Sequence, residues 1–127
     1  MKNQIKKTIE IARALKPLKQ CFREWHCAVI FDGNIIKSIG YNTSKTHPRS
    51  RDFGYPYPEK CLHAETMAVI RGKLEDYRGH DLIVIRVDNN GKLNNSKPCK
   101  YCEFLLRRLN FNSIIFSDSK GNFEELT

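Results

Sequence analysis

The chain has 127 residues, which allows one domain with a substantial core and leaves no room for a second. Hydrophobic residues make up 40% and the formal net charge is +8, a composition typical of a basic globular protein. No stretch approaches the ~20 apolar residues that a membrane span needs, and no apolar signal core follows the first residues. We therefore expect a single cytoplasmic domain over residues 1–127 that does not contact a membrane.

The first 15 residues have the periodicity of an amphipathic helix. Apolar side chains recur at steps of three and four residues and predict a helix with its apolar side inward, at Ile5, Ile9, Ile11, Ala12 and Leu15. Pro17 is expected to end or kink this helix, and Leu18 and Phe22 are compatible with a short second one.

Positive charge is concentrated at the start of the chain. Seven basic residues against one acidic residue give +6 within the first 23 positions. A basic face can hold nucleic acid or steer an anionic nucleotide toward a cleft, but a solvated helix face has the same composition. The sequence leaves both interpretations open.

Two apolar runs, residues 27–31 and 34–41, flank the dipeptide Asp32-Gly33. Asp-Gly between such runs is a strong hairpin signal, because both central residues of the favoured turn need positive φ. We therefore expect two antiparallel strands here.

Residues 43–62 show no periodicity and are rich in proline, aromatic and basic residues. The residues of interest are Lys45, His47, Pro48, Arg49, Arg51, Phe53, Tyr55, Pro56, Tyr57 and Pro58. A loop of this length in a compact domain is usually functional or mobile. Aromatics between arginines are suited to stack bases and hold phosphates, so the basic N-terminal helix and the 45–60 loop are one candidate nucleic-acid contact. A loop that covers a cleft or packs against a second subunit fits the sequence equally well.

The second half of the chain alternates between helical and strand patterns. These patterns predict a helix over about 62–71 ending at Gly72, a central strand over 81–87, a loop over 88–95, a helix from Pro98 through Leu109 and a strand over 113–116. The chain is then expected to turn at Lys120-Gly121-Asn122 and return as an antiparallel edge strand. This order predicts an α/β fold, a three-layer α/β/α sandwich with a mixed sheet and right-handed crossovers.

The five cysteines favour a metal or catalytic role for two of them over a disulfide framework. An odd number does not close into pairs, and the Cys-x-x-Cys spacing of Cys99 and Cys102 in a cytosolic protein is more often metal-binding or catalytic. We expect the other three, Cys21, Cys27 and Cys61, to be small buried apolar residues.

Two motifs supply three candidate metal ligands and one further carboxylate. They are His63-Ala64-Glu65 and Pro98-Cys99-Lys100-Tyr101-Cys102. Zinc takes thiolate sulfur and imidazole nitrogen readily, and residues three apart are neighbours on a helical turn. His63, Cys99 and Cys102 make three protein ligands, the number at catalytic zinc sites with an open fourth position. His63 and Glu65 point in different directions around a helix, so both reach one metal only at the helix N-terminus. The same holds for Cys99, and two positive helix ends favour thiolate there.

Other interpretations of the two motifs remain. The cysteines could form a thioredoxin-like redox pair, although this leaves His63-Ala64-Glu65 unexplained. A closed structural zinc would use Cys61 as a fourth ligand, and activity or water at the zinc would exclude it. His26, His47 and His80 have no partner pattern and are expected to be surface or core histidines.

H-x-E followed by P-C-x-x-C is the signature of the zinc nucleobase deaminases, so the chain from about Ala28 to Phe116 resembles the cytidine/deoxycytidylate deaminase superfamily. The resemblance implies Zn2+ as cofactor and Glu65 as the catalytic acid/base that moves protons between water, ring and amine. It also implies that the backbone near Ala64 binds the base edge, that Ala28 lies under the ring and that Asn42 contacts the sugar. Asn42 fits a turn residue equally well.

The resemblance reduces the number of candidate substrates. Free-cytidine deaminases carry cysteine at the position of His63. In this respect the chain looks more like the deoxycytidylate, tRNA-adenosine and polynucleotide branches. Only eleven residues follow Phe116, too few for the further helix and parallel strand of those branches. We expect deamination of cytosine in a deoxycytidine nucleotide, with cytosine or adenine in single-stranded DNA or tRNA as the alternative. The other class of function is a non-catalytic, zinc-stapled nucleic-acid-binding module. The resemblance also implies that the protein is a homo-oligomer.

Overall fold

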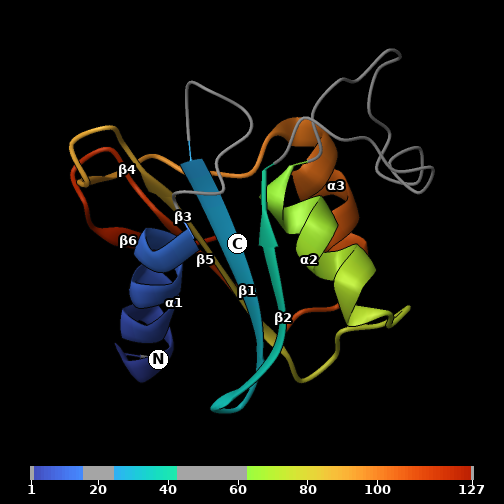
Figure 1. Ribbon diagram of the computed structural model, residues 1–127. Helices are drawn as coiled ribbons and strands as arrows, with labels where there is room; N and C mark the ends of the chain where they lie inside the picture. The colour runs from blue at the N-terminus through green and yellow to red at the C-terminus, as the bar shows by residue number, and fades with distance from the viewer. Residues whose placement is uncertain (1, 16–24, 43–62, 127) are drawn as a thin grey trace.

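The computed structural model describes residues 2–15, 25–42 and 63–126. Several predictions fall outside these residues: the short helix around Leu18 and Phe22, the 45–60 loop, and the surroundings of Cys21 and Cys61. The described residues form one sheet between two helical layers (Figure 1).

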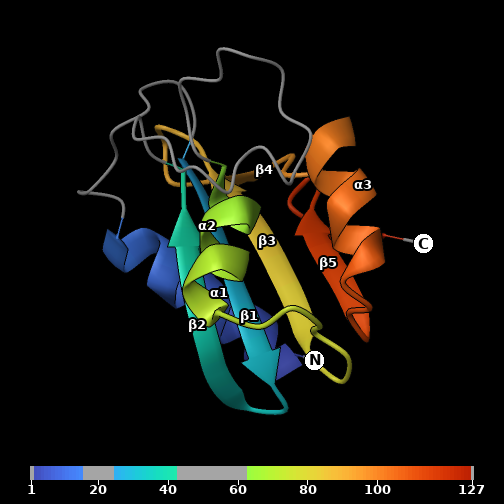
Figure 2. The same ribbon diagram turned by 90° about the vertical axis from the view of Figure 1, so that its right-hand side faces the viewer.

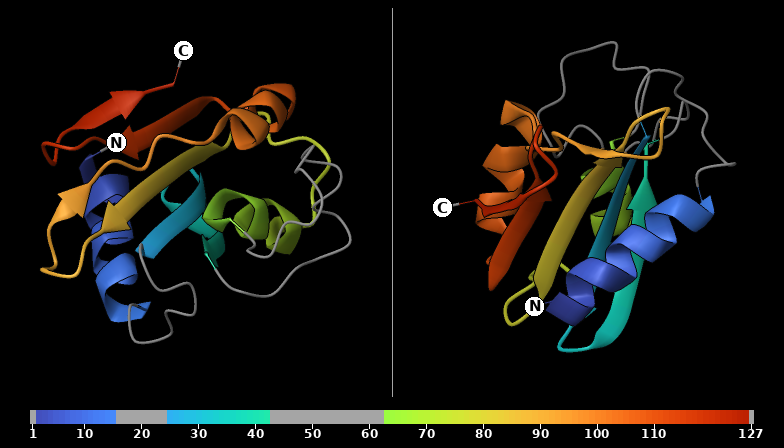
Figure 3. Two further views of the ribbon diagram at one scale, coloured as in Figure 1. Left: turned by 90° about the horizontal axis from the view of Figure 1, so that it is seen from above. Right: turned by 90° about the vertical axis from the view of Figure 1, so that its left-hand side faces the viewer.

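In the part of the chain that the structure describes, three helices make up the two layers. Helix α1 (Lys2–Leu15) covers one face of the sheet, and α2 (Ala64–Gly72) and α3 (Lys100–Arg108) cover the other (Figure 3). Within the described residues, no helix is both long enough and apolar enough to cross a membrane.

The sheet is mixed, with its central strands side by side in Figure 2. Its six strands are β1 (Trp25–Asp32), β2 (Ile35–Tyr41), β3 (Asp81–Val87), β4 (Leu93–Asn94), β5 (Ser113–Ser117) and β6 (Phe123–Glu125). Their order is β2-β1-β3-β5-β6, and β4 pairs with β3. β3 and β5 are parallel, whereas the other pairs are antiparallel. The predicted α/β/α sandwich, the hairpin and the returning edge strand are confirmed.

Successive side chains of the central strands point to opposite helical layers. On β3, Ile83 and Ile85 belong to the core beneath α1, whereas Leu82 and Val84 belong to the core beneath α2 and α3. β1 divides in the same way, with odd-numbered residues beneath α1 and even-numbered residues beneath α2 and α3. Because successive side chains of a strand point to opposite faces, a strand covered on both faces is apolar almost throughout. The central position predicted for residues 81–87 is confirmed.

The inward side of α1 differs from the predicted apolar stripe. Its buried residues are Gln4, Thr8 and Ala12, and the predicted isoleucines are only partly buried beside them. The Gln4 side-chain amide donates hydrogen bonds to the carbonyl of Gly33 and the carboxylate of Asp81, at 2.6 and 3.1 Å. The Thr8 hydroxyl donates to the Gln4 carbonyl at 2.8 Å. Hydrogen bonding makes these polar residues tolerable in the interior, which an apolar periodicity cannot reveal.

The predicted loop over residues 88–95 contains a strand, which corrects that expectation. β4 pairs with the end of β3, where Asn94 lies opposite Arg86. Asp88 closes the intervening turn, because its Oδ1 accepts the backbone N–H groups of Asn90 and Lys92, both at 2.9 Å. The turn returns the chain to the sheet and produces a short hairpin.

Helix α2 ends at Gly72 as predicted, but this glycine is needed for space and not for a left-handed turn. The residue with positive φ is Lys73, at 59°. A Cβ at Gly72 would collide with the hydroxyl of Tyr77, which donates a hydrogen bond of 2.6 Å to the Val69 carbonyl.

A second glycine, Gly40, allows α2 to approach β2 closely. A Cβ at Gly40 would collide with backbone atoms of Ala64 and Ala68. Ser38, two residues earlier, donates a hydrogen bond of 2.6 Å from its Oγ to the Ala68 carbonyl. The first turns of α2 are therefore fixed on β2 by direct backbone contact.

We expect Gly40→Ala to lower the free energy of unfolding by about 1–3 kcal/mol, because an inserted methyl group must displace helix backbone. Chemical denaturation measures the change. Lys37→Ala, at an exposed position of the same strand, is the matched control and should lie within about 0.5 kcal/mol of the wild type. Equal stability of the G40A variant and the wild type would contradict this close approach.

Candidate metal centre

The three predicted metal ligands meet where α2 and α3 begin. His63 is the N-cap residue of α2 and Cys99 is the N-cap residue of α3, both with extended backbone angles. The His63 carbonyl accepts the first helical hydrogen bond from Met67 at 3.0 Å, and the Cys99 carbonyl accepts that from Glu103 at 2.8 Å. The two side chains therefore lie at the positive ends of two helix dipoles, which favour anionic ligands.

The separations between the ligand atoms fit a tetrahedral zinc ion. His63 Nδ1 lies 3.6 Å from Cys99 Sγ and 3.5 Å from Cys102 Sγ. The ligand atoms of all three residues lie within 4.8 Å of one another. Nitrogen at about 2.0–2.1 Å and sulfur at about 2.3 Å from a tetrahedral zinc are separated by roughly 3.6 Å. The donor set, one imidazole and two thiols, is also one that zinc prefers.

The electrostatic surroundings of Cys99 favour the thiolate that a metal requires. Hydrogen bonding to the Cys102 thiol, aided by His63, outweighs the opposing effect of burial and lowers the pKa of the Cys99 thiol to about 4. A thiol with this pKa is ionised at neutral pH and ready to bind a cation.

Thr66 supports the second thiol from within α2. Its side chain is fully buried, and its Oγ1 lies 3.8 Å from Cys102 Sγ. When Cys102 is a thiolate, the hydroxyl is the group that donates, and donors of this kind hold and orient metal ligands. The sequence motif does not include Thr66, although it directly follows Glu65.

We expect Thr66→Val to weaken zinc binding by about tenfold or more, because the isosteric side chain removes the hydrogen bond to Cys102. Competition with a chromogenic chelator measures the affinity. Thr66→Ser keeps the hydroxyl and should stay close to the wild type. Equal affinities of the Val and Ser variants would remove Thr66 from the metal centre.

A cavity of about 300 Å³ adjoins two of the three ligands, His63 and Cys99. Four of its lining residues come from the helix N-termini: His63, Ala64, Glu65 and Cys99. Glu65 lies in the first turn of α2 with only 5% of its surface exposed. A buried carboxylate that borders both a metal-binding group and a cavity is well placed to move protons on a bound molecule.

The residues predicted to bind substrate are placed differently from one another. Ala64 and Asn42 line the cavity. Asn42 Oδ1 accepts the backbone N–H of His26 at 3.0 Å, so β1 orients the Asn42 amide. Ala28 is fully buried in the core beneath α2 and α3 and is not among the residues that line the cavity.

Several cavity residues are not predicted by the sequence motifs. His26, expected to be a surface or core histidine, lines the cavity from β1, and Arg86 lines it from β3. Asn95, Ser96 and Lys97 line it from the segment that leads into α3. The available signal is the strand period, since His26 and Arg86 are even-numbered residues and so belong to the face covered by α2 and α3.

Buried serines fix the segment that carries Cys99. Ser96 Oγ donates to the Val84 carbonyl at 2.7 Å and accepts the Ser117 backbone N–H at 3.1 Å. Ser117 Oγ donates to the Asn94 carbonyl at 2.6 Å. These bonds attach the chain before α3 to β3 and β5, and they thereby position Cys99.

The other described cysteine does not take part in this centre. Cys27 is buried on the side of the sheet that faces α1, and burial raises the pKa of its thiol to about 12. The prediction that Cys27 is a small buried residue is confirmed. Cys61, the fourth ligand of the closed-site alternative, lies outside the described residues.

Comparison with known proteins identifies the fold. No protein-family model matches the chain, and no curated protein sequence matches it. Solved structures do match. A dCMP deaminase from the cyanophage S-TIM5, in apo form, is 18% identical, with a TM-score of 0.65 over 94% of this chain and 86% of that chain. A cytidine deaminase from Burkholderia pseudomallei is 14% identical, with a TM-score of 0.61 over 95% and 90%. A cytidine deaminase from Mycobacterium leprae is 18% identical, with a TM-score of 0.60 over 94% and 91%. At these identities, the likeness shows a cytidine deaminase-like fold.

Proposed function

We propose that this protein is a zinc-dependent hydrolase that deaminates a nucleobase, converting cytosine to uracil in a deoxycytidine nucleotide with release of ammonia. One observation carries the proposal: one imidazole and two thiols converge at two helix N-termini beside a buried glutamate and a cavity. The cytidine deaminase-like fold supports it. The S-TIM5 enzyme, which has this fold, has been solved in complex with dCMP and dUMP.

The metal ligands in this proposal are His63, Cys99 and Cys102. When bound by such a set, zinc supplies Lewis acidity that lowers the pKa of water to about 7. The chain contributes a thiolate at Cys99 and the Thr66 hydroxyl beside Cys102, and both favour retention of a cation.

Glu65 is the catalytic residue that moves protons. Its carboxylate takes a proton from the attacking water as oxygen bonds to C4 of the cytosine ring. It delivers this proton to N3, then takes the remaining proton from the new C4 hydroxyl and passes it to the amino group, so that the C4–N bond breaks and ammonia leaves. Water and cytosine thereby become ammonia and uracil, with no oxidant or reductant required. Placement in the first turn of α2 keeps Glu65 beside both the metal ligands and the cavity.

The remaining contacts orient the base and sugar. The backbone at Ala64 binds the edge of the base, and the Asn42 amide, oriented by His26, contacts the sugar. Ala28, expected under the ring, belongs to the packed layer beneath α2 and α3 and does not itself line the cavity.

A base within a polynucleotide is the second candidate substrate. It is favoured by the exposed basic residues of α1, namely Lys2, Lys6, Lys7 and Arg13. A positive helix face of this kind attracts phosphate backbones. The non-catalytic alternative, a zinc-stapled nucleic-acid-binding module, uses the same surface without chemistry.

A panel assay tests the proposal. Zinc-loaded protein is incubated with deoxycytidylate, cytidine, single-stranded DNA and tRNA, and the products are analysed for uracil and inosine. Uracil formation from deoxycytidylate is the expected result. Salt-dependent binding of nucleic acid with no ammonia release from any substrate would select the non-catalytic module instead.

A further inference from the structure

Helix α1 covers only part of its face of the sheet. It packs on β1 and β3, and β5 and β6 continue the sheet to one side of it. Strands spaced about 4.8 Å apart make a sheet of this order roughly 19 Å wide, whereas one helix covers about 10 Å. On the opposite face, two helices share the covering (Figure 3). Within the described residues, the α1 face therefore has room for one more helix beside α1.

A groove of about 470 Å³ lies at this place, between α1 and β6. Its floor is apolar, because Ile5 and Ile9 of α1 and Phe123 of β6 all line it. These three side chains pack against the core beneath α1 but are only partly buried. The groove therefore presents apolar surface that a second apolar stripe could remove from water.

The wall of the groove that α1 forms is basic toward solvent. Lys2, Lys6 and Arg13 are exposed and line the groove. At about 3.6 residues per turn, these three positions fall within roughly 40° of one another on the helical wheel, and Ile9 is next to them. The wall thus changes from apolar near the sheet to basic at the rim, over the whole length of the helix.

The charge at this rim selects what can dock there. Glu10 is the only acidic residue among the described residues that line the groove. The Arg13 guanidinium donates a hydrogen bond of 3.3 Å to the Gly91 carbonyl in the β3–β4 turn, which holds it at one end of the groove. A guanidinium has further N–H donors that a carboxylate can accept. An occupant with negative charge on the side that faces α1 is therefore complementary.

The described helices of a second copy do not supply such an occupant. α1 and α3 both carry more basic than acidic residues, and α2 is mostly buried against the sheet. Two α1 helices lying side by side would bring like charges together, which costs binding energy. The complementary partner is therefore a different chain.

We propose that the groove between α1 and β6 docks an amphipathic, acidic helix of another protein. Its apolar stripe packs on Ile5, Ile9 and Phe123, and its acidic flank meets the cations of α1. This is helix-in-groove recognition, in which residues at i, i+3, i+4 and i+7 are the anchors. Lys2 and Arg13 are about 17 Å apart along the helix axis, which matches about three turns of a partner helix. The groove lies on the face opposite the metal ligands, so the inference is independent of the proposed function.

The test uses a synthetic peptide of about 18 residues as the probe, long enough to form a helix in isolation. Leucines at i, i+3, i+4 and i+7 form its apolar stripe, glutamates flank the stripe, and a terminal fluorescein reports binding by anisotropy. A second peptide has the same composition in scrambled order. A single-stranded oligodeoxynucleotide of equal charge is the third probe. Each probe is titrated with the full chain.

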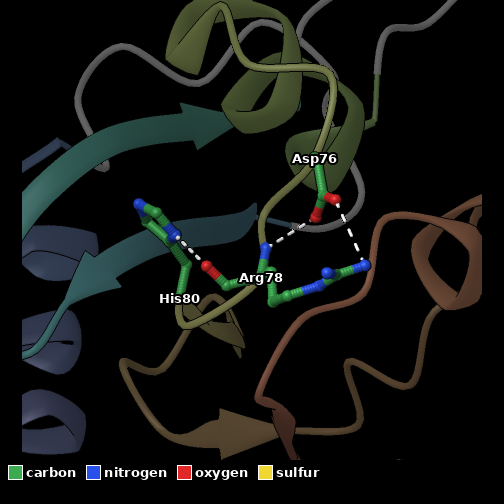
Figure 4. Close-up of polar contacts among 3 residues, drawn as sticks. All are labelled: Asp76, Arg78 and His80. Atoms are coloured by element: carbon green, nitrogen blue, oxygen red, sulfur yellow. Dashed lines mark hydrogen bonds and ion pairs between the residues drawn. The ribbon is translucent and has the colours of Figure 1, made fainter.

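Two double variants change the net charge by the same amount. Lys6→Glu/Arg13→Glu reverses the charge at the rim of the groove. Lys37→Glu/Arg78→Glu is the control and reverses two exposed cations elsewhere. Lys37 lies on β2, at the edge of the sheet opposite β6. Arg78 lies between α2 and β3, where it pairs with Asp76 at 3.6 Å (Figure 4). Thermal unfolding followed by circular dichroism checks that both variants are folded.

The helical peptide is expected to bind the wild type at least about tenfold more tightly than the scrambled peptide, because only the helical peptide presents a stripe. K6E/R13E should weaken this binding by about tenfold or more, since two attractions become repulsions, whereas K37E/R78E should retain it. NMR spectra of the wild type should show the amide signals of Ile9 and Phe123 shifting on addition of the helical peptide, which locates the site without any variant.

Four results would overturn the inference. They are no binding of the helical peptide, equal affinity for the two peptides, binding unchanged in folded K6E/R13E, and peptide-induced shifts away from the groove. Binding of the oligonucleotide alone would also contradict it and would make this face a nucleic-acid surface instead. None of these results depends on zinc or on turnover, so the proposed function is tested separately.

Discussion

Replacing Glu65 by glutamine is expected to lower kcat for deamination by at least about 10²–10⁴-fold, because the amide cannot accept a proton from water or return one to the ring and the amine. The substitution preserves the size of a side chain that is buried in the first turn of α2. Zinc content and thermal stability should therefore remain close to those of the wild type. Loss of turnover at constant metal content is the result that identifies a proton-transfer residue.

Glu103→Gln is the matched control for this variant. Glu103 lies in the first turn of α3, as Glu65 does in α2, but it binds Arg107 at 2.8 Å on the outer surface and does not line the cavity. Loss of such an i,i+4 pair costs only about 0.3–0.5 kcal/mol of stability, so activity should be unaffected. A metal-replete E65Q variant that turns over at the wild-type rate would exclude Glu65 from the mechanism.

Replacing Cys99 by serine is expected to remove zinc and activity together. The hydroxyl of serine stays protonated at neutral pH, whereas the environment of Cys99 lowers the pKa of its thiol to about 4 and provides an anionic ligand. Loss of one of three protein ligands should reduce zinc affinity by more than the roughly 10–100-fold typical of a lost supporting contact. Metal analysis after gel filtration and a chelator competition both measure the effect.

Cys27→Ala provides the comparison for Cys99→Ser. Cys27 is buried on the α1 side of the sheet, and the raised pKa of its thiol leaves it protonated. This variant is expected to be somewhat less stable, because a buried side chain is shortened, but it should keep the full complement of zinc per folded chain. If C99S retained stoichiometric zinc while C27A lost it, the metal centre would lie elsewhere in the chain.

The strands and helices that could be predicted are those with a strong local signal. The Asp32-Gly33 turn and the apolar run of β3 depend on neighbouring residues alone, so both were predictable. The buried side of α1 was not, because Gln4 is stabilised by Gly33 and Asp81, which are distant in sequence. The β4 strand depends on a turn at Asp88 and on the end of β3, with which β5 does not pair. A local sequence pattern shows neither of these.

The residues of the candidate site also include some that the sequence predicts and some that it does not. His63, Cys99 and Cys102 were predictable because two spaced motifs carry them, and the structure brings their ligand atoms together. Arg86 and His26 were not, because their proximity depends on the register between β1 and β3. The candidate metal ligands can thus be predicted from short sequence motifs. The shape and charge of the adjoining cavity depend on which strands pair and in which register.

The proposed metal centre is an open zinc site with one imidazole, two thiolates and a position left for solvent. X-ray absorption at the zinc edge of the purified protein tests it most directly. We expect one zinc per chain, with two sulfur ligands at about 2.3 Å and two nitrogen or oxygen ligands at about 2.0–2.2 Å. Absence of zinc, or a site with three sulfur ligands such as Cys61 would complete, would contradict it.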